Sequence, residues 1–234
     1  MEKLKFDFLA FMREVPVPRI AILGSTGSGK TVFARKLCGH YLTRKRKILV
    51  VDPKWEFDDI KTLDLKEFLP YDRKSFIRKL RSLQYCDLKF ENPLQISEFL
   101  ASLCWYFTPS VLYLEEIAEY IGKNDHLPES HPLVYKVLQQ GRSQKAGIIA
   151  ATQMVSQLNL AFIRQSNEIF VFAMGKEETR TLEKHLGLER DTLAFELPTR
   201  EEKAKGINKD LYCFYEFQHG TAPTFYKPIS YKKR

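Results

Sequence analysis

Two glycines, a lysine and a threonine are spaced in this sequence as Gly-x4-Gly-Lys-Thr, at Gly24, Gly29, Lys30 and Thr31. Glycines let backbone N–H groups curl around an anion, and the lysine adds a point charge. The residues from Arg19 to Gly24 predict a short apolar strand, and those after Gly29 predict a helix whose N-terminus adds positive potential. This pattern predicts a nucleotide phosphate loop, against the alternative of a glycine-rich turn with an exposed lysine.

The whole loop is a candidate binding site for the β- and γ-phosphates of a nucleotide. Its candidate contacts are Gly24, Ser25, Thr26, Gly27, Ser28, Gly29, Lys30, Thr31 and Val32. Lys30 is also a candidate catalytic cation, and the Thr31 hydroxyl is a candidate ligand of Mg²⁺. The run NKD at Asn208 is one residue short of the guanine-reading NKxD, which disfavours a GTPase.

A second candidate group is the apolar run VLYLEE, which ends in the carboxylates Glu115 and Glu116. It has the form of a Walker B strand, in which carboxylates at the end of a buried strand reach the metal and the attacking water. Glu115 is predicted to hold Mg²⁺ through water, and Glu116 to act as general base. The alternative is a strand that leads into an acidic helix start. Glu119 is a rival for the base.

The order of elements predicts an α/β fold. Strand, loop, helix and strand follow one another from Arg19 to Asp52, and this order implies parallel strands. We predict a RecA-like (ASCE) P-loop NTPase fold, with a mainly parallel central sheet flanked by helices and a C-terminal β-hairpin. Residues 1–18 are predicted to be an N-terminal amphipathic segment, and residues 19–234 a single ATPase domain.

Composition sets limits on the class of protein. The 234 residues contain 37 Lys and Arg against 29 Asp and Glu, a net charge of +8, which mildly supports a nucleic-acid partner. The four cysteines lie far apart without a CxxC pair, so neither a zinc site nor a disulfide framework is indicated. No apolar run approaches the length of a spanning helix. We expect a soluble, cytoplasmic protein without a transmembrane segment.

Five stretches in order resemble the FtsK-HerA superfamily of DNA-pumping ATPases. They are GSTGSGKT, VVDPKWEF, LYLEE, GRSQKAGIIAATQ and IRQSNEIFVF, and they fall between Arg19 and Met174. Within the superfamily the chain most resembles the genome-packaging ATPases of membrane-containing icosahedral viruses of archaea and bacteria. One departure is that the family usually has Asp-Glu where this chain has Glu115 and Glu116.

The resemblance implies an ATPase that uses ATP and Mg²⁺ to translocate double-stranded DNA, packaging a viral genome into a preformed capsid. It implies a ring of identical subunits, most simply a homohexamer, in the cytoplasm of a host cell or associated with the virion. A capsid vertex or a membrane-associated virion protein is an implied partner. Because the membrane segments and accessory domains of cell-division and conjugation pumps are missing, a minimal motor core is expected.

Two further candidate residues come from the GRSQKAGIIAATQ stretch. By resemblance, the Gln153 amide holds the lytic water or the phosphate and senses the nucleotide; a buried glutamine that satisfies a turn is the alternative. Arg142, at the start of the strand or on the preceding helix, is predicted to act as an arginine finger on a neighbouring subunit, or else to form a surface ion pair. Arg164 and Arg180 are weaker candidates for that role.

Other functions stay open on the sequence alone. A DNA-pumping ATPase of conjugation, segregation or phage export is one alternative, and a P-loop small-molecule kinase or nucleotide-binding module is another. Lys54 would lie near the phosphate loop, or be a solvated turn residue. The segment from Gly122 to Pro132 is expected to be a long functional loop, with Lys123 as a candidate DNA contact.

Overall fold

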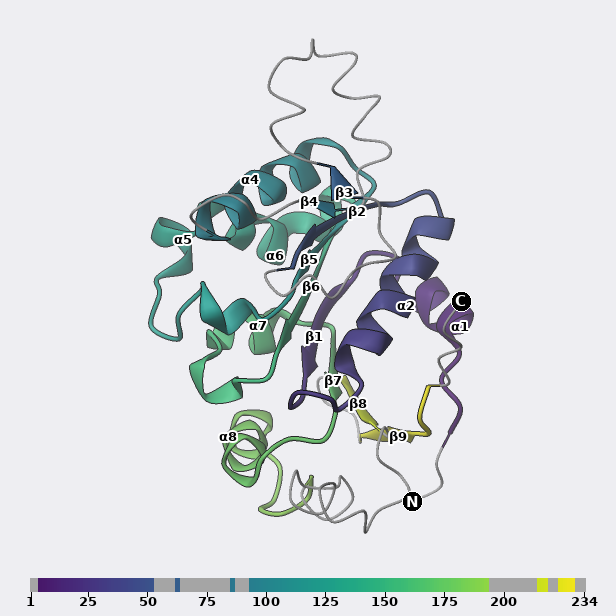
Figure 1. The fold of residues 1–234 in the computed structure, drawn as a ribbon, viewed down its shortest axis with the longest axis vertical. Helices are drawn as coiled ribbons and strands as arrows, with labels where there is room; N and C mark the ends of the chain where they lie inside the picture. Colours follow the sequence, from purple (N-terminus) through teal and green to yellow (C-terminus); the bar gives the residue numbers. More distant parts are fainter. Residues whose placement is uncertain are drawn as a thin grey trace.

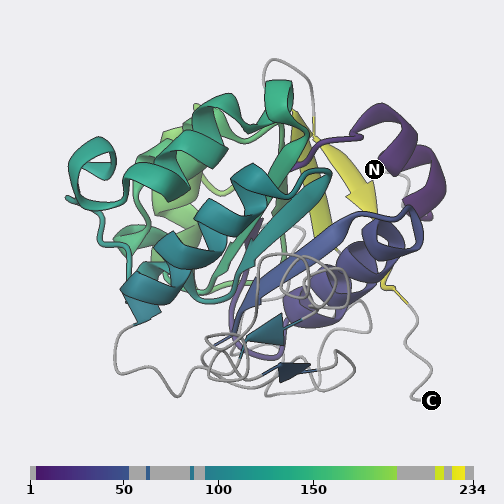
Figure 2. The same cartoon turned by 90° about the horizontal axis from the view of Figure 1, so that it is seen from above.

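The computed structural model describes residues 4–52, 62–63, 85–86, 93–193, 214–218 and 223–229. Within them the chain forms three layers, with a central sheet between two sets of helices (Figures 1 and 2). Helices on both faces are expected where crossover connections join parallel strands. The predicted α/β class is confirmed.

Seven strands form the central sheet, in the spatial order β2-β5-β6-β1-β7-β8-β9. They are β1 (Arg19–Leu23), β2 (Lys47–Val51), β5 (Ser110–Leu114), β6 (Ala146–Thr152), β7 (Glu168–Val171), β8 (Phe214–Gln218) and β9 (Thr224–Tyr226). The first five are parallel, and β8 and β9 add an antiparallel pair at one edge. The mainly parallel sheet and the C-terminal strand pair were both predicted. A separate two-stranded sheet joins β3 (Thr62–Leu63) and β4 (Tyr85–Cys86).

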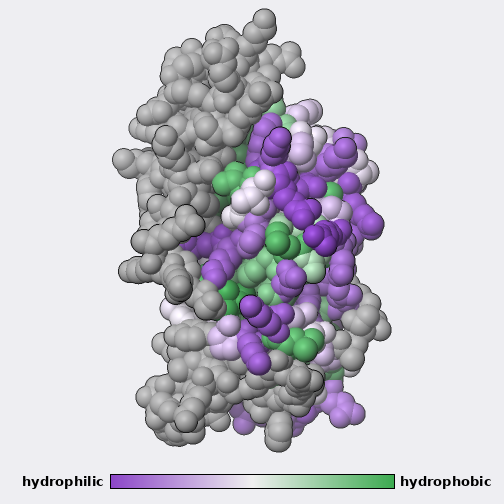
Figure 3. All heavy atoms as spheres, turned by 90° about the vertical axis from the view of Figure 1, so that its right-hand side faces the viewer, coloured by the Kyte–Doolittle hydropathy of each residue, from purple (hydrophilic) through white to green (hydrophobic). Residues whose placement is uncertain are grey.

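The helices divide between the two faces of the sheet. On one face lie α1 (Phe8–Glu14) and α2 (Lys30–Thr43), and on the other lie α4 (Pro93–Tyr106), α6 (Pro132–Gln144), α7 (Leu160–Gln165) and α8 (Lys176–Leu186). Shorter elements are α5 (Leu127–Ser130) and the 3₁₀ turns η2 (Ile117–Glu119) and η3 (Val155–Gln157). On the side of the molecule that carries α1 and α2, hydrophilic and hydrophobic residues are interspersed (Figure 3). No helix in the described ranges is long and apolar enough to cross a bilayer.

The inner strands are buried on both faces. On β1, Ile20 and Ile22 pack with the residues of α2, while Ala21 and Leu23 pack with those of α4 and α6. The α2 side is rich in aromatic rings. Burial on both faces leaves the strand ends as the places where polar side chains of the sheet can do chemistry.

The parallel register brings the carboxyl ends of four strands to one edge of the sheet. Leu23 pairs with Thr152 on β6, and Leu114 at the end of β5 pairs with Val51 on β2 and Ala150 on β6. The residues that follow these strands therefore emerge side by side. They are Gly24, Asp52, Glu115 and Gln153.

Helix α6 ends at Gln144, and the next residue, Lys145, takes a left-handed conformation with φ of 60°. The Lys145 N–H donates to the carbonyl of Arg142, which closes the last turn. Arg142 therefore lies on the helix that precedes β6, one of the two placements that the sequence allowed.

The segment from Gly122 to Pro132 is more ordered than the functional loop we expected. It contains α5, and the Asn159 amide donates to the carbonyls of Gly122 at 3.2 Å and Asp125 at 2.8 Å. The Asp125 carboxylate accepts from the Gly122 N–H and hydrogen-bonds the buried His131 ring at 3.0 Å. The buried Asn159 side chain thus fixes the backbone that follows β5. Its amide donates the hydrogen bonds that these carbonyls would otherwise accept from water.

Two glycines within helices give a matched test of this packing. A Cβ added at Gly141 would lie 2.1 Å from the carbonyl oxygen of Ala146, whereas one added at Gly39 would meet nothing within 4 Å. We expect Gly39→Ala to stabilise the fold by about 1 kcal/mol through helix propensity. Gly141→Ala is expected to destabilise it by about 1–3 kcal/mol through overpacking. Chemical denaturation followed by circular dichroism checks both, and equal stabilities would contradict the close approach of α6 to β6.

Candidate functional site

The phosphate loop connects β1 to α2 and is held by the ends of two neighbouring strands. The Gly24 N–H donates to the Thr152 carbonyl at 3.2 Å. Ser25 donates to the Ala173 carbonyl from its N–H at 2.8 Å and from its hydroxyl at 2.9 Å. The loop is therefore fixed to the last residue of β6 and to the segment that follows β7, as a preformed cradle requires.

Glycine is required in this loop for two different reasons. Gly27 and Gly29 have φ of 69° and 99°, in the left-handed region that glycine enters at no steric cost. Gly24 is required for close approach, because a Cβ there would lie 2.7 Å from the Phe172 Cβ and from the Ser28 hydroxyl oxygen. That buried hydroxyl has no hydrogen-bond partner among the described residues, as expected of a group that a ligand satisfies.

Lys30 begins α2 and is the buried cation of the site. Its ammonium group contacts Glu115 Oε1 at 3.2 Å and Glu116 Oε1 at 2.9 Å, and all three side chains are almost inaccessible to solvent. Burial alone would lower the pKa of Lys30, but the two carboxylates outweigh it, so the pKa lies above its usual value. The lysine is therefore charged, and it holds the N-terminus of α2 against the end of β5.

Glu115 is oriented by a tyrosine two residues before it. The Glu115 N–H continues the sheet by donating to the Val51 carbonyl at 2.8 Å. Its Oε2 accepts a hydrogen bond from the Tyr113 hydroxyl, while its Oε1 faces Lys30. Tyr113 was missed at the sequence level, although the two-residue period of a strand places it on the same face as Glu115.

Glu116 occupies an unusual backbone conformation. Its φ of 47° and ψ of 45° lie in the left-handed region, which costs a non-glycine residue about 1–3 kcal/mol and is often found at functional sites. The buried carboxylate is held by Lys30 at Oε1 and by the Gln153 N–H at Oε2, at 3.0 Å. Glu116 is thus directed into the site, whereas the rival Glu119 is exposed on η2.

Gln153 connects the phosphate loop to Glu116. It follows β6 directly, and its side-chain oxygen accepts a hydrogen bond from the Thr26 hydroxyl. Its main-chain N–H bonds Glu116, so one residue contacts both the loop and the candidate base. A glutamine in this place is suited to sensing the state of a nucleotide.

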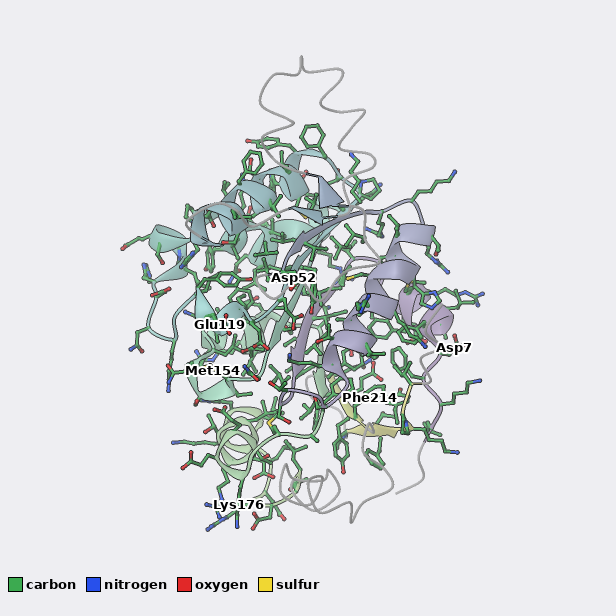
Figure 4. The ribbon with its side chains drawn as sticks, in the orientation of Figure 1. Asp7, Asp52, Glu119, Met154, Lys176 and Phe214 are labelled. Atoms are coloured by element: carbon green, nitrogen blue, oxygen red, sulfur yellow. The ribbon has the colours of Figure 1, made fainter. Side chains whose placement is uncertain are left out.

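Asp52 is a further acidic residue that sequence analysis did not single out. It follows β2 and is fully buried. Burial, Glu115, Glu119, Glu116 and Asp52 together raise the pKa of Tyr120 well above its usual value. Asp52 and Glu119 are labelled in the central part of Figure 4. Asp52 could have been recognised from the sequence by its position at a strand end, within the VVDPKWEF stretch. Lys54 of the same stretch lies outside the described residues.

The structure brings most of the candidate residues together and leaves one apart. Thr31 and Val32 follow Lys30 on α2, half-buried in the first turn. Arg142 is exposed in the last turn of α6. Burial, followed by the charge of Arg142, lowers the pKa of Arg19, so Arg142 lies near the start of β1. The phosphate loop follows the other end of that strand, so Arg142 is remote from the loop of its own chain.

This set of groups fits a nucleotide with a divalent cation. The cradle offers backbone N–H groups, a charged lysine and an unsatisfied serine hydroxyl to phosphate oxygens. The Glu115 carboxylate is a hard oxygen ligand of the kind Mg²⁺ takes, and Thr31 offers a hydroxyl. The residues that would hold Mg²⁺ are Thr31 and Glu115.

The chain matches the family model described as "Helicase HerA, central domain" over residues 17–184, which is more than half of its length. The chain belongs to the HerA central-domain family. It is accordingly a P-loop ATPase of the HerA/FtsK type, and the predicted superfamily is confirmed. No protein with a curated description matches the sequence significantly.

Solved structures agree with the HerA-type fold. The genome packaging NTPase B204 of Sulfolobus turreted icosahedral virus 2, in complex with AMPPCP, is 18% identical with a TM-score of 0.61, covering 92% of this chain and 100% of that one. VirB4 of Thermoanaerobacter pseudethanolicus is 11% identical with a TM-score of 0.58, covering 91% of this chain and 89% of that one. At these identities the likeness establishes the fold.

The contact between Tyr113 and Glu115 generates a prediction. Tyr113→Phe removes a hydroxyl that orients the candidate metal carboxylate, and partners of this kind are typically worth about 10- to 100-fold in metal affinity or activity. We expect the Mg²⁺ concentration for half-maximal ATP hydrolysis to rise by about that factor. The control is Tyr41→Phe, which removes a buried hydroxyl bonded to the Val15 carbonyl at 2.7 Å. An equal Mg²⁺ requirement in both variants would rule out this role for Tyr113.

Proposed function

We propose that this HerA-family ATPase is an ATP-driven translocase of double-stranded DNA that packages a viral genome into a preformed capsid. The observation that carries the proposal is the continuous network from the phosphate loop through Lys30, Glu115, Glu116 and Gln153. The likeness to B204, which is described as a genome packaging NTPase and is covered over its whole length, supports packaging as the task.

Each residue of the network is assigned one task in hydrolysis. In the absence of nucleotide, Lys30 neutralises the two carboxylates. When nucleotide binds, Lys30 exchanges these contacts for the phosphate oxygens. Glu115 and Thr31 hold Mg²⁺, which when bound offsets the charge of the transferred phosphoryl group. Glu116 takes the proton of the attacking water as general base, and Gln153 orients that water. The left-handed backbone at Glu116 directs its carboxylate toward the loop.

The position of Arg142 supports a ring assembly. A transition state of phosphoryl transfer spreads negative charge, and an arginine supplied by a neighbour is worth about 10³ to 10⁵ in rate in other P-loop enzymes. Arg142 lies near the start of β1, so it could serve only another subunit's nucleotide. We propose a homohexameric ring around duplex DNA, in the host cytoplasm or associated with the virion. A capsid vertex or a membrane-associated virion protein would anchor it.

A second function is favoured by one comparison. The likeness to VirB4 extends over 89% of that chain, so a DNA-pumping role in conjugation, segregation or phage export is the alternative. A small-molecule kinase or nucleotide-binding module is disfavoured by family membership. Duplex DNA distinguishes a translocase from a kinase, because it would stimulate ATP hydrolysis by a translocase and leave the ATP hydrolysis of a kinase unchanged.

The first test compares two neighbouring glutamates in the presence and absence of duplex DNA. Glu116→Gln is expected to bind ATP but to hydrolyse it about 10²- to 10⁴-fold more slowly, because it loses the general base. Glu119→Gln removes the same charge from an exposed side chain and is expected to keep its activity. Lys30→Ala is expected to lose ATP binding or hydrolysis. Near-normal hydrolysis by Lys30→Ala, or no response of the native chain to DNA, would refute the motor.

The second test addresses the trans role of Arg142. Arg142→Ala and Glu116→Gln subunits are each expected to be inactive, whereas a mixture at ring-forming concentration should regain ATP hydrolysis. An intact arginine of one chain then faces the intact base of its neighbour. Lys145→Ala removes an exposed cation three residues away and is expected to stay active. If the mixture remains inactive although both variants bind ATP and assemble, the assignment of Arg142 is wrong.

A further inference from the structure

Helix α8 carries a stripe of positive charge. Lys176, Arg180 and Lys184 are spaced four residues apart, so they lie along one side of the helix, and all three are exposed. Leu182 and Thr179 of the same helix are buried toward the core. Figure 4 places Lys176 at the periphery of the molecule, away from Asp52 at its centre.

Cations from two other elements extend this stripe. Burial lowers the pKa of His185, and the charges of Lys123, Lys184 and Arg164 lower it further. Each of these three cations therefore lies near His185, although Lys123 follows β5, Arg164 ends α7 and Lys184 belongs to α8. The backbone supports this placement, because Asn159 at the start of α7 donates to the Lys123 carbonyl and α8 packs on η3. Lys123 and Arg164 are exposed. We call Lys123, Arg164, Lys176, Arg180 and Lys184 the basic surface.

The charges of the basic surface are available to a partner. None of its five residues forms an ion pair or a hydrogen bond through its side chain with another described residue. Glu177 is exposed in the first turn of α8, but the neighbouring Glu178 is turned inward, where it accepts from Ser156 at 2.6 and 2.7 Å. Helix α8 also carries Glu177, Glu178 and Glu183, so its own charges balance, and the excess positive charge comes from Lys123 and Arg164.

The backbone under the basic surface is fixed. Asn159 donates to the Lys123 carbonyl at 3.4 Å and to the carbonyls of Gly122 and Asp125. Helix α8 ends in a left-handed Gly187, whose N–H donates to the Glu183 carbonyl. A charged partner would therefore meet cations on ordered segments, which lowers the entropy lost on binding.

We propose that the basic surface binds the sugar-phosphate backbone of duplex DNA, an inference that rests on the proposed translocase function. The stripe from Lys176 to Lys184 is about 12 Å long, and a DNA strand presents one phosphate every 3.4 Å or so along the axis. An anionic membrane is the poorer fit, because interfacial helices pair their cations with an apolar face. The exposed large hydrophobic residues in the described ranges lie on none of these three segments.

The test neutralises two lysines of the basic surface and compares the result with the neutralisation of two control cations on the far side of the molecule. Lys176→Gln/Lys184→Gln is the test variant, and Lys5→Gln/Arg13→Gln changes the net charge equally on the N-terminal segment next to α2. Affinity for a duplex of arbitrary sequence is measured from 50 to 200 mM salt, with full-length chains. Vesicles that contain anionic phospholipid are the second probe.

The slope of log affinity against log salt is expected to fall by about 1.8 in the test variant, because each lost phosphate contact removes about 0.9. At 100 mM salt this corresponds to a loss of affinity of about 60-fold, if affinity extrapolated to 1 M is unchanged. The control pair should change the slope much less. ATP hydrolysis without DNA should stay the same in both, because none of the four residues contacts the nucleotide site.

Four outcomes would overturn the inference. They are an unchanged slope in the test variant, equal losses in both pairs, loss of vesicle binding without loss of DNA binding, and a test variant that does not fold although it removes only exposed side chains. If the native chain binds no duplex DNA at all, the translocase function fails as well. Native binding that is insensitive to the test variant would overturn the basic surface alone.

Discussion

The buried ion pairs of Lys30 are the interaction on which the site depends. A lysine and two carboxylates lie together in the interior, and any one of them without the others would carry a large desolvation cost. Together they join the first residue of α2 to the residues that follow β5. The same three groups are the ones that phosphate and Mg²⁺ chemistry requires. The packing of α2 against the sheet and the arrangement of the candidate phosphate and Mg²⁺ groups therefore depend on the same interaction.

Much of this arrangement could be predicted from the sequence. Glycines and a lysine at fixed spacing specify a phosphate loop, and apolar runs that end in Glu115 or Gln153 place those side chains at the edge of a parallel sheet. Both inferences rest on local patterns, and the structure places these residues together. The full residue-by-residue assignment of roles stays a prediction.

Other features depend on contacts that the sequence does not display. The left-handed backbone of Glu116 is supported by Lys30 and by the Gln153 N–H, from two other elements. Gly141 allows the last turn of α6 to approach β6 because its missing side chain makes room for the Ala146 carbonyl. The basic surface is assembled from three separate segments, and only its α8 stripe shows a helical period. Tertiary packing decides each of these cases.

Strand β6 lies between two parts of the candidate site. It begins just after the helix that carries Arg142, it ends just before Gln153, and all seven of its residues are buried. A strand of this length is about 23 Å long and stiff along its axis. If Arg142 serves a neighbour, the ends of β6 face two different nucleotides. The length of the strand would then set the distance between successive ATP molecules around the ring, independently of the loops that contact them.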